Sequence, residues 1–388
     1  MSENRFYLSS SPHFTLGNST QKIMLTVLIA MLPECIWGVV MFGLPALITI
    51  LVSVLSCVVF ELLFQIVTKQ KIVISNLSAA VTGVLLALVC SPMVPWWMIC
   101  LGAAVSVIVA KGLFGGIGSN VFNPALTGRA FLFISFPAVM GSKWLNPSFV
   151  PDFCKTGKFA QNSVDIVNGT VDALTSATPL SMISKTDFNF DLQTFWEYFL
   201  GFKSGCIGEI SIALILISFI FLLVTKTIDW RAPVSFVLSV AVFSFLSGLI
   251  STSTILGAAN ELLLNLLTGG LFFGACFMVT DYATTPVTKK GRLAFGLGCG
   301  IITFLIRKFG GYPEGVMFSI LIMNSIAPFL NNLTVRMYGY GKKGHKRADL
   351  SKINMTFDLN NAKLFKDNGE GVIFVESNKN DEQGGSNE

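Results

Sequence analysis

The sequence is poor in charge, in histidine and in closely spaced cysteine pairs, and each scarcity excludes a class of protein. Charged residues make up 13% of the 388 residues, against about 25% in an ordinary soluble domain. Composition therefore excludes a soluble enzyme, a secreted disulfide scaffold and a disordered protein. The two histidines, His13 and His345, lie near the termini, and none of the eight cysteines forms a Cys-x-x-Cys motif. The sequence thus predicts no metal site of its own, neither zinc nor iron–sulfur.

What the sequence has in abundance is long apolar runs without charge. Hydrophobic residues make up 52% of the chain, and an uncharged apolar run of about 20 residues is typical of a membrane span. Four such runs are 72–110, 232–260, 262–280 and 315–335. We therefore predict an all-α polytopic membrane protein with about ten transmembrane helices. The expected spans are roughly 23–41, 44–67, 73–91, 96–111, 125–141, 209–225, 232–250, 255–280, 292–308 and 314–336.

The distribution of lysine and arginine predicts the orientation, because cytoplasmic loops are enriched in these residues. Both termini are expected in the cytoplasm, and only Arg307 and Lys308 fall on the wrong side. Because the basic residues lie in loops between spans, they indicate no nucleic-acid partner. The predicted organisation is a cytoplasmic N-terminus (1–22), a five-helix half (23–141), a long extracytoplasmic loop (142–208), a second five-helix half (209–336) and a cytoplasmic, largely disordered tail (337–388) in which 372–375 could form a short strand.

A weak internal repeat links the two halves. Residues 124–131, PALTGRAF, resemble residues 286–295, PVTKKGRLAF, and both open a span from an inner loop. Duplication is frequent in membrane transport folds, which place sites at the repeat interface. Chance similarity between two helix starts is the alternative, and the sequence leaves both open.

Charged residues inside spans are costly and are therefore candidates for function. Glu34 and Asp281 are the candidates for ion translocation, because a carboxylate among apolar helices can coordinate Na⁺ or relay a proton. The alternative for either residue is a structural role: snorkelling, or an ion pair with Arg129 or Arg292, with Lys289 as a further partner for Asp281. Glu61 and Glu261 are also placed within spans.

Two further features have alternative interpretations. The glycine-rich loop 115–124 could direct backbone N–H groups at an anion, or form a tight re-entrant turn between spans. Cys154 and Cys206 share the segment expected outside the membrane and could form a disulfide, or remain free thiols.

Four stretches together give the sequence a specific resemblance. They are residues 112–118 with 122–126, residues 172–180, residues 280–288 and residues 307–315. With them, the chain resembles, from Ser9 to about Tyr340, the family formed by the D subunit of the Rnf ion-translocating electron-transport complex and the B subunit of the sodium-pumping NADH:quinone reductase.

The resemblance implies a covalent cofactor. In this family the last threonine of a pattern like Asp-x-x-Ser-Gly-Ala-Thr carries FMN through its phosphate, attached by a flavin transferase. The matching residue here is Thr178, preceded by Asp172 and Ala177. Thr175 and Ser176 replace the commoner serine and glycine, and both replacements are small.

The resemblance also implies a function and partners. It describes a multi-pass subunit of the bacterial inner membrane that relays electrons between reduced ferredoxin and NAD⁺ and couples this to Na⁺ or H⁺ movement. The expected partners are a second flavin-bearing subunit and iron–sulfur subunits in the membrane and the cytoplasm, so the protein is expected to be inactive alone and to contain no catalytic residue of its own. A second, non-covalent flavin such as riboflavin is compatible with the resemblance.

Other functions remain open from the sequence. Within the family, the alternative is the B subunit of the quinone reductase, although the short N-terminus and the Ala-Thr-Pro-Leu ending of the motif favour Rnf. Many relatives have aspartate where this chain has Asn331, which argues against a carboxylate role there. Outside the family, a transporter or channel component without redox function, or a structural scaffold, fits the apolar spans equally well. A flavin on Thr178 would exclude both.

Overall fold

The computed structural model describes residues 19–142, 144–145, 192–310, 315–332, 340–341 and 344–345. The chain divides into a membrane unit, Asn18–Thr334, and a terminal unit formed by Met1–Gly17 and Val335–Glu388. In the terminal unit, β1 (Tyr340–Gly341) and β2 (Gly344–His345) pair antiparallel, which is an exception to the all-α prediction. The strand considered at 372–375 lies outside the described residues.

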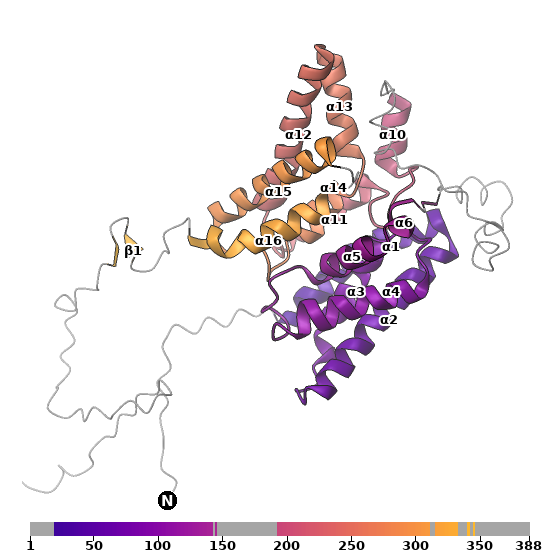
Figure 1. Cartoon of the computed structure of the whole chain (residues 1–388), viewed down its shortest axis with the longest axis vertical. Helices are drawn as coiled ribbons and strands as arrows, with labels where there is room; N and C mark the ends of the chain where they lie inside the picture. Colours follow the sequence, from indigo (N-terminus) through magenta and orange to yellow (C-terminus); the bar gives the residue numbers. More distant parts are fainter. Residues whose placement is uncertain are drawn as a thin grey trace, which may run out of the picture. The chain divides into compact units, whose positions relative to one another are not determined.

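In the described part of the membrane unit the elements are helical, and they form two halves (Figure 1). The first half contains α1 (Thr20–Phe42), α2 (Leu44–Val67), η1 (Ile74–Asn76), α3 (Ser78–Leu88), α4 (Trp96–Ala104), η2 (Val105–Gly112), α5 (Pro124–Ser135) and α6 (Pro137–Ser142). The second contains α10 (Leu192–Leu200), α11 (Ile212–Val224), α12 (Arg231–Thr252), α13 (Ile255–Leu267), α14 (Leu271–Phe273), η3 (Gly274–Met278), α15 (Lys289–Phe309) and α16 (Val316–Asn332).

Local sequence explains how α1 turns directly into α2. Ser19 caps the start of α1 by accepting a hydrogen bond from the backbone N–H of Lys22 at 3.2 Å. Gly43 ends it with a φ of 71°, a backbone conformation that favours glycine. Pro45 then lies in the first turn of α2, where a missing N–H costs nothing. A single residue therefore separates two long helices.

In helix α2 the exposed side chains are apolar and most of the buried ones are polar, which is the opposite of a helix in a soluble protein. The exposed face of α2 carries Leu51 and Leu55, which are 53% and 63% exposed, whereas Ser53, Glu61 and Gln65 are buried. Apolar side chains facing outward and polar ones facing the bundle are expected where the surroundings are lipid. The packing thus supports the prediction of a membrane protein.

The spans are less regular than predicted. Within the described part of the chain, three helices are long and apolar enough to cross a membrane, namely α1, α2 and α12. Helix α13 and the segment α14–η3 form a pair bent by 58°. The prediction of one continuous span over 255–280 is wrong, because the helix breaks at Gly269, whose φ is 59°, and Gly270. The span expected over 73–91 contains the short 3-10 helix η1 and the eleven residues of α3. The span expected over 125–141 is interrupted at Phe136, before Pro137.

The segment predicted as an extracytoplasmic loop is described only in part. Its last part folds into the membrane unit: Ile207 and Gly208 donate backbone hydrogen bonds to the carbonyls of Cys90 and Leu88, at 3.2 and 2.7 Å. Cys206 is buried, and Cys154, with which a disulfide was considered, lies outside the described residues. Residues 146–191, the larger part of this segment, lie outside the described residues.

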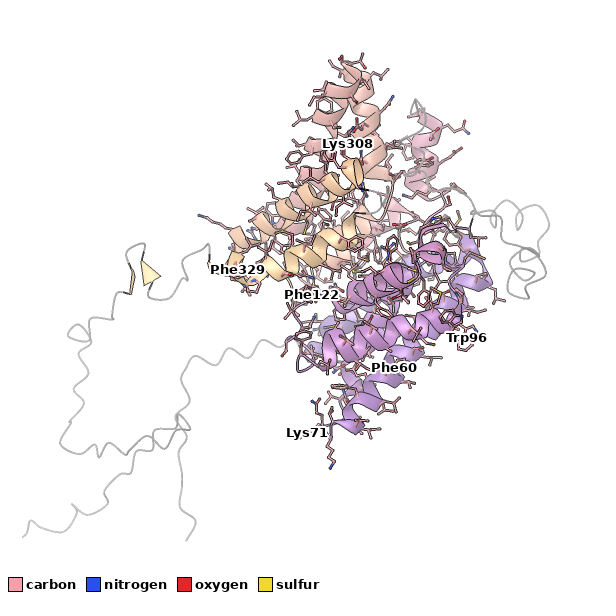
Figure 2. All side chains as sticks on the ribbon, viewed as in Figure 1. Phe60, Lys71, Trp96, Phe122, Lys308 and Phe329 are labelled. Carbon is pink, nitrogen blue, oxygen red and sulfur yellow. The ribbon has the colours of Figure 1, made fainter. Side chains whose placement is uncertain are left out.

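Helix α4 continues directly into η2, which leads to the glycine-rich loop. Trp96 begins α4, and the glycine-rich loop containing Phe122 follows the far end of η2, so the two labelled side chains lie apart (Figure 2). The loop contains three glycines with positive φ, Gly115, Gly116 and Gly118. This geometry supports the interpretation of the loop as a tight turn.

Candidate functional site

A cavity of about 370 Å³ lies where elements of both halves end. We call it the Asp281 cavity. The first half contributes the start of α3, the end of η2, the glycine-rich loop and the start of α5, and the second half contributes the ends of α11 and η3 and the loop that follows. Its polar lining includes Ser78, Lys111, Asn120, Asn123, Thr280 and Asp281.

The two segments of the internal repeat meet at this cavity. In both cases a π-helix and a loop come before a capped helix start: η2 precedes α5, and η3 precedes α15. Asn123 caps α5 by accepting from the N–H groups of Ala125 and Leu126, and Thr288 caps α15 by accepting from Gly291. The shared order of elements is what a duplication would produce, so the similarity extends beyond sequence.

Asp281 lies in the loop after η3, is half-buried and lines the cavity. Its Oδ2 accepts a hydrogen bond from Thr284 Oγ1 at 3.1 Å, and its Oδ1 accepts a long one from Ala283 N at 3.5 Å. Burial raises the pKa of Asp281, while the hydrogen bonds from Thr284 and from the backbone of Ala283 and Tyr282 lower it, with a net rise. Burial therefore favours the protonated form of this carboxyl group.

The salt bridge considered for Asp281 is not formed within the described residues. Arg292 instead donates to Asp229 Oδ2 at 2.9 Å and to the carbonyl of Pro286. Asp229 also pairs with Arg231 at 2.8 Å. Burial raises the pKa of Asp229, but the hydrogen bonds from Arg231 and Arg292 outweigh it, so the pKa lies below its usual value. Arg292 is thus already committed to a structural pair.

Lys111 forms a buried ion pair beside the cavity. Its Nζ lies 2.7 Å from Glu61 Oε2 and 2.6 Å from Ser78 Oγ. Gln65 donates to the other oxygen of Glu61 at 3.4 Å and accepts from Val73 N. The sequence indicates Lys111 only as a loop charge and gives Glu61 no partner, since a separation of 50 residues leaves no local signal of the pairing.

A second polar cluster lies at the break between α13 and α14. Glu209 accepts hydrogen bonds from the backbone N–H groups of Cys206 and Gly270. Lys203 donates to the carbonyl of Leu267 at 2.5 Å. Arg307 donates to the carbonyls of Asn265, Thr268 and Gly269 at 2.6, 3.2 and 2.9 Å. We call Lys203, Glu209 and Arg307 the break cluster.

Hydrogen bonds within the break cluster and a separate ion pair explain the two exceptions to the charge rule, Arg307 and Lys308. Carbonyls freed by a helix break need partners where water is scarce, and Arg307 supplies three hydrogen bonds to them. Lys308 pairs with Glu261 at 3.2 Å. Both basic residues therefore stabilise local structure, and neither needs to lie in the cytoplasm.

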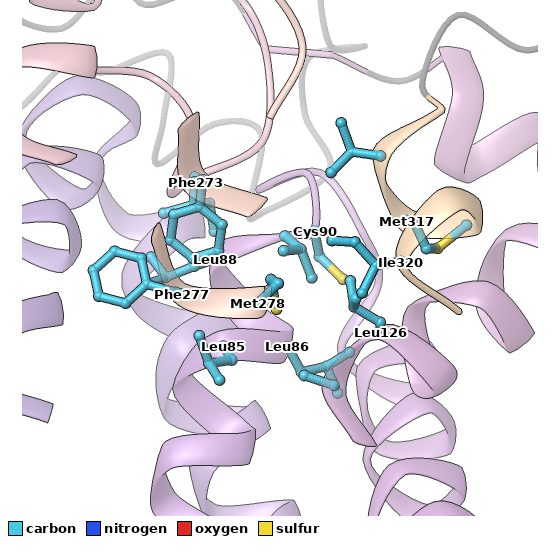
Figure 3. Close-up of a cluster of buried hydrophobic side chains, with 14 of the residues drawn as sticks. Leu85, Leu86, Leu88, Cys90, Leu126, Phe273, Phe277, Met278, Met317 and Ile320 are labelled. Atoms are coloured by element: carbon cyan, nitrogen blue, oxygen red, sulfur yellow. The ribbon is translucent and has the colours of Figure 1, made fainter. Parts of the chain in front are cut away.

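A layer of buried apolar side chains, of which Figure 3 shows a part, extends from the wall of the Asp281 cavity toward the break cluster. Helix α3 crosses it, with Ser78 lining the cavity and Leu88 lining a second cavity of about 20 Å³ that also contacts Glu209 and Arg307. Eleven helical residues rise about 16 Å, about half the thickness of the hydrocarbon core. The layer contains Leu85, Leu86, Leu88, Leu126, Phe273, Phe277 and Met278.

Glu34 is the second predicted candidate, and it does not line the Asp281 cavity. It lies in α1, is 3% exposed, and neither carboxyl oxygen has a hydrogen-bond partner among the described residues. The ion pairs considered for it are not formed, because Arg129 donates to Cys206 Sγ at 3.3 Å and Arg292 pairs with Asp229.

The predicted flavin attachment residues lie outside the described part of the chain. They are Asp172, Thr175, Ser176, Ala177 and Thr178. Among the residues that are described, no group of three or more His, Cys, Asp or Glu side chains could hold a metal ion.

Comparison with known proteins gives consistent matches over most of the chain. A model of the NQR2, RnfD, RnfE family matches residues 7–339. The D subunit of the Na(+)-translocating ferredoxin:NAD(+) oxidoreductase complex of Acetobacterium woodii is 37% identical over 345 residues, 88% of this chain and 98% of the relative. The D subunit of the proton-translocating ferredoxin:NAD(+) oxidoreductase complex of Clostridium ljungdahlii is 36% identical over 339 residues, 86% of this chain and 95% of the relative. The D subunit of the ion-translocating oxidoreductase complex of Salmonella typhimurium is 35% identical over 357 residues, 87% of this chain and 99% of the relative.

Proposed function

The chain belongs to the NQR2, RnfD, RnfE family and is an integral membrane protein, and on this premise we propose that it is the membrane flavoprotein subunit of a redox-driven ion pump. It works as the D subunit of an ion-translocating ferredoxin:NAD⁺ oxidoreductase complex of the bacterial inner membrane, with both termini in the cytoplasm. The observation that carries the proposal is the full-length match to relatives with that name. The B subunit of a quinone reductase is the alternative within the family.

The proposal includes a covalent FMN on Thr178. It is supported by the retained Asp172, Ala177 and Thr178 of the attachment pattern. The bond is a phosphoester to the threonine hydroxyl, made by a flavin transferase, so the cofactor is anchored without a change to its ring system. A bound flavin supplies the capacity to accept and donate single electrons, and the tether prevents its loss.

The Asp281 cavity is the proposed place for the second, non-covalent flavin. Its volume is about 370 Å³, and it has mostly apolar walls and a few polar groups, which is typical of cofactor sites. Lys111, Asn120 and Asn123 are the residues that would hold such a group. The two helix starts at Ser78 and Pro124 also face it, and their N-terminal ends favour negative charge.

Coupling to the ion is proposed at Asp281. A carboxylate binds a cation more tightly when negative charge arrives nearby, and this coupling is reciprocal. Asp281 lines the same cavity as the residues proposed to hold the flavin. Between this cavity and the break cluster an ion would have to cross only the apolar layer, which is the proposed barrier against leakage.

One experiment tests both flavins. The complex is purified after coexpression with a flavin transferase, precipitated with acid, and both fractions are analysed by mass spectrometry. We expect riboflavin in the supernatant and the added mass of FMN on the peptide containing Thr178. The variant Thr178→Ala should lose the covalent flavin, whereas the matched variant Thr175→Ala should keep it. An unmodified Thr178 peptide despite an active transferase would reject the covalent site, and would restore a transporter or scaffold without redox function as the better explanation.

A further inference from the structure

Glu34 is a buried acid without a partner to stabilise its charge. It is 3% exposed, and neither Oε1 nor Oε2 accepts or donates a hydrogen bond among the described residues. An ionised carboxylate in apolar surroundings is strongly unfavourable, and such a group becomes neutral unless it is paired. Glu61 shows the contrast, because it is equally buried but lies 2.7 Å from Lys111 Nζ.

The groups around Glu34 are weakly polar and uncharged. Ser218 of α11 faces it, but the hydroxyl of Ser218 already donates to the carbonyl of Ala30 at 2.7 Å. Cys35 and Cys276 lie near enough to interact electrostatically with it. A metal cation needs several oxygen ligands to replace its water, whereas a proton needs one. This environment therefore suits a proton and not Na⁺.

Glu34 lies in the part of the helix bundle next to the Asp281 cavity. Three residues of the cavity wall are close in sequence to the groups around Glu34: Val27 of α1, Leu222 of α11 and Phe277 of η3. Val27 precedes Glu34 by two helical turns, a rise of about 10 Å. On the other side, Gly38 packs directly against Ile207 of the buried loop. Glu34 thus lies between the cavity and that loop.

We propose that Glu34 is a proton-binding site in the membrane interior, protonated in the resting protein and reached from the Asp281 cavity. Binding adds H⁺ to one carboxylate oxygen and gives a neutral carboxylic acid, and release returns H⁺ and the carboxylate. This deepens the proposed function by naming the ion held at Glu34. Its role in transport rests on that function, whereas its protonation does not.

The protonation state can be measured without turnover. Infrared difference spectra of the purified complex, wild type minus Glu34→Gln, should contain the C=O stretching band of a carboxylic acid at neutral pH. The matched variant Glu61→Gln should leave that band in place and remove carboxylate absorption, because Glu61 forms an ion pair with Lys111. A spectrum in which Glu34→Gln removes only carboxylate absorption would overturn the proposal.

The identity of the ion is tested by a lipid-soluble carbodiimide, which adds to protonated carboxyl groups. The added mass is expected on the peptide containing Glu34, absent from the one containing Glu61, and unchanged by excess Na⁺ at constant pH. Protection by Na⁺ would assign the site to Na⁺ and overturn its assignment to a proton.

In vesicles, Glu34→Gln should abolish H⁺ uptake while electron transfer continues, and wild-type uptake in this variant would refute the role in transport. If the wild-type complex itself moves no ion, the proposed function fails and the infrared result stands independently.

Discussion

At the scale of single residues, the buried carboxyl groups differ in what surrounds them. Glu61 is paired with Lys111, Asp281 is held by Thr284 and backbone N–H groups, and Glu34 has no hydrogen-bond partner among the described residues. The sequence marks all three as costly charges in or near spans, but it does not reveal the pairing, because the partners come from distant helices. Which groups surround each carboxyl group is therefore known only from the tertiary structure.

The change Asp281→Asn should uncouple the complex. Asparagine keeps the shape and the hydrogen bonding with Thr284 but removes the negative charge, so electron transfer should persist while ion uptake is lost. Both are measured separately in vesicles that contain the assembled complex. The control is Glu261→Gln, because Glu261 pairs with Lys308 and does not line the Asp281 cavity. Wild-type uptake with Asp281→Asn would contradict the assignment, and failed assembly would favour a structural role.

At the scale of elements, short helices form part of the walls of the Asp281 cavity. Helix α3 and the segment α14–η3 cross only the apolar layer, and their ends border the Asp281 cavity on one side and the break cluster on the other. Gly269 and Gly270 permit the break, and basic side chains satisfy the carbonyls it exposes. The broken helix is therefore a stable feature.

Arg307→Gln should destabilise this element more than the neighbouring change Lys308→Gln. Glutamine cannot make the three hydrogen bonds of Arg307 to carbonyls of the break, and each unsatisfied buried group costs about 1–3 kcal/mol. Thermal unfolding of the purified protein should show a clearly lower Tm for Arg307→Gln and a Tm close to wild type for Lys308→Gln. Equal effects of the two changes would show that the carbonyls find other partners.

At the scale of the whole molecule, the two halves of the membrane unit form one cavity. The described residues hold no cluster of metal ligands, and the sequence predicts no ferredoxin- or NAD-binding module. The relatives that match the chain are named as subunits of complexes. The protein is therefore expected to act only with its partners.

The purified protein should not oxidise NADH on its own, even when it carries its covalent flavin. The assembled complex should do so, with ferredoxin as the other redox partner. Both are assayed by NADH absorbance at equal flavin content, so that the comparison does not depend on cofactor loading. NADH oxidation by the isolated protein would contradict the assignment as a relay and indicate a complete enzyme.

The sequence alone was sufficient for the membrane class, for most helix positions and for the family, because apolar runs, helix caps and the motifs around residues 112–126 and 280–288 are local signals. Tertiary structure alone decided the break at Gly269 and Gly270, the burial of the loop around Cys206, the pairing of Glu61 with Lys111 and the isolation of Glu34. These features depend on which helices meet across the bundle. The free energy of a buried charge is set by those neighbours, and residues distant in sequence supply them.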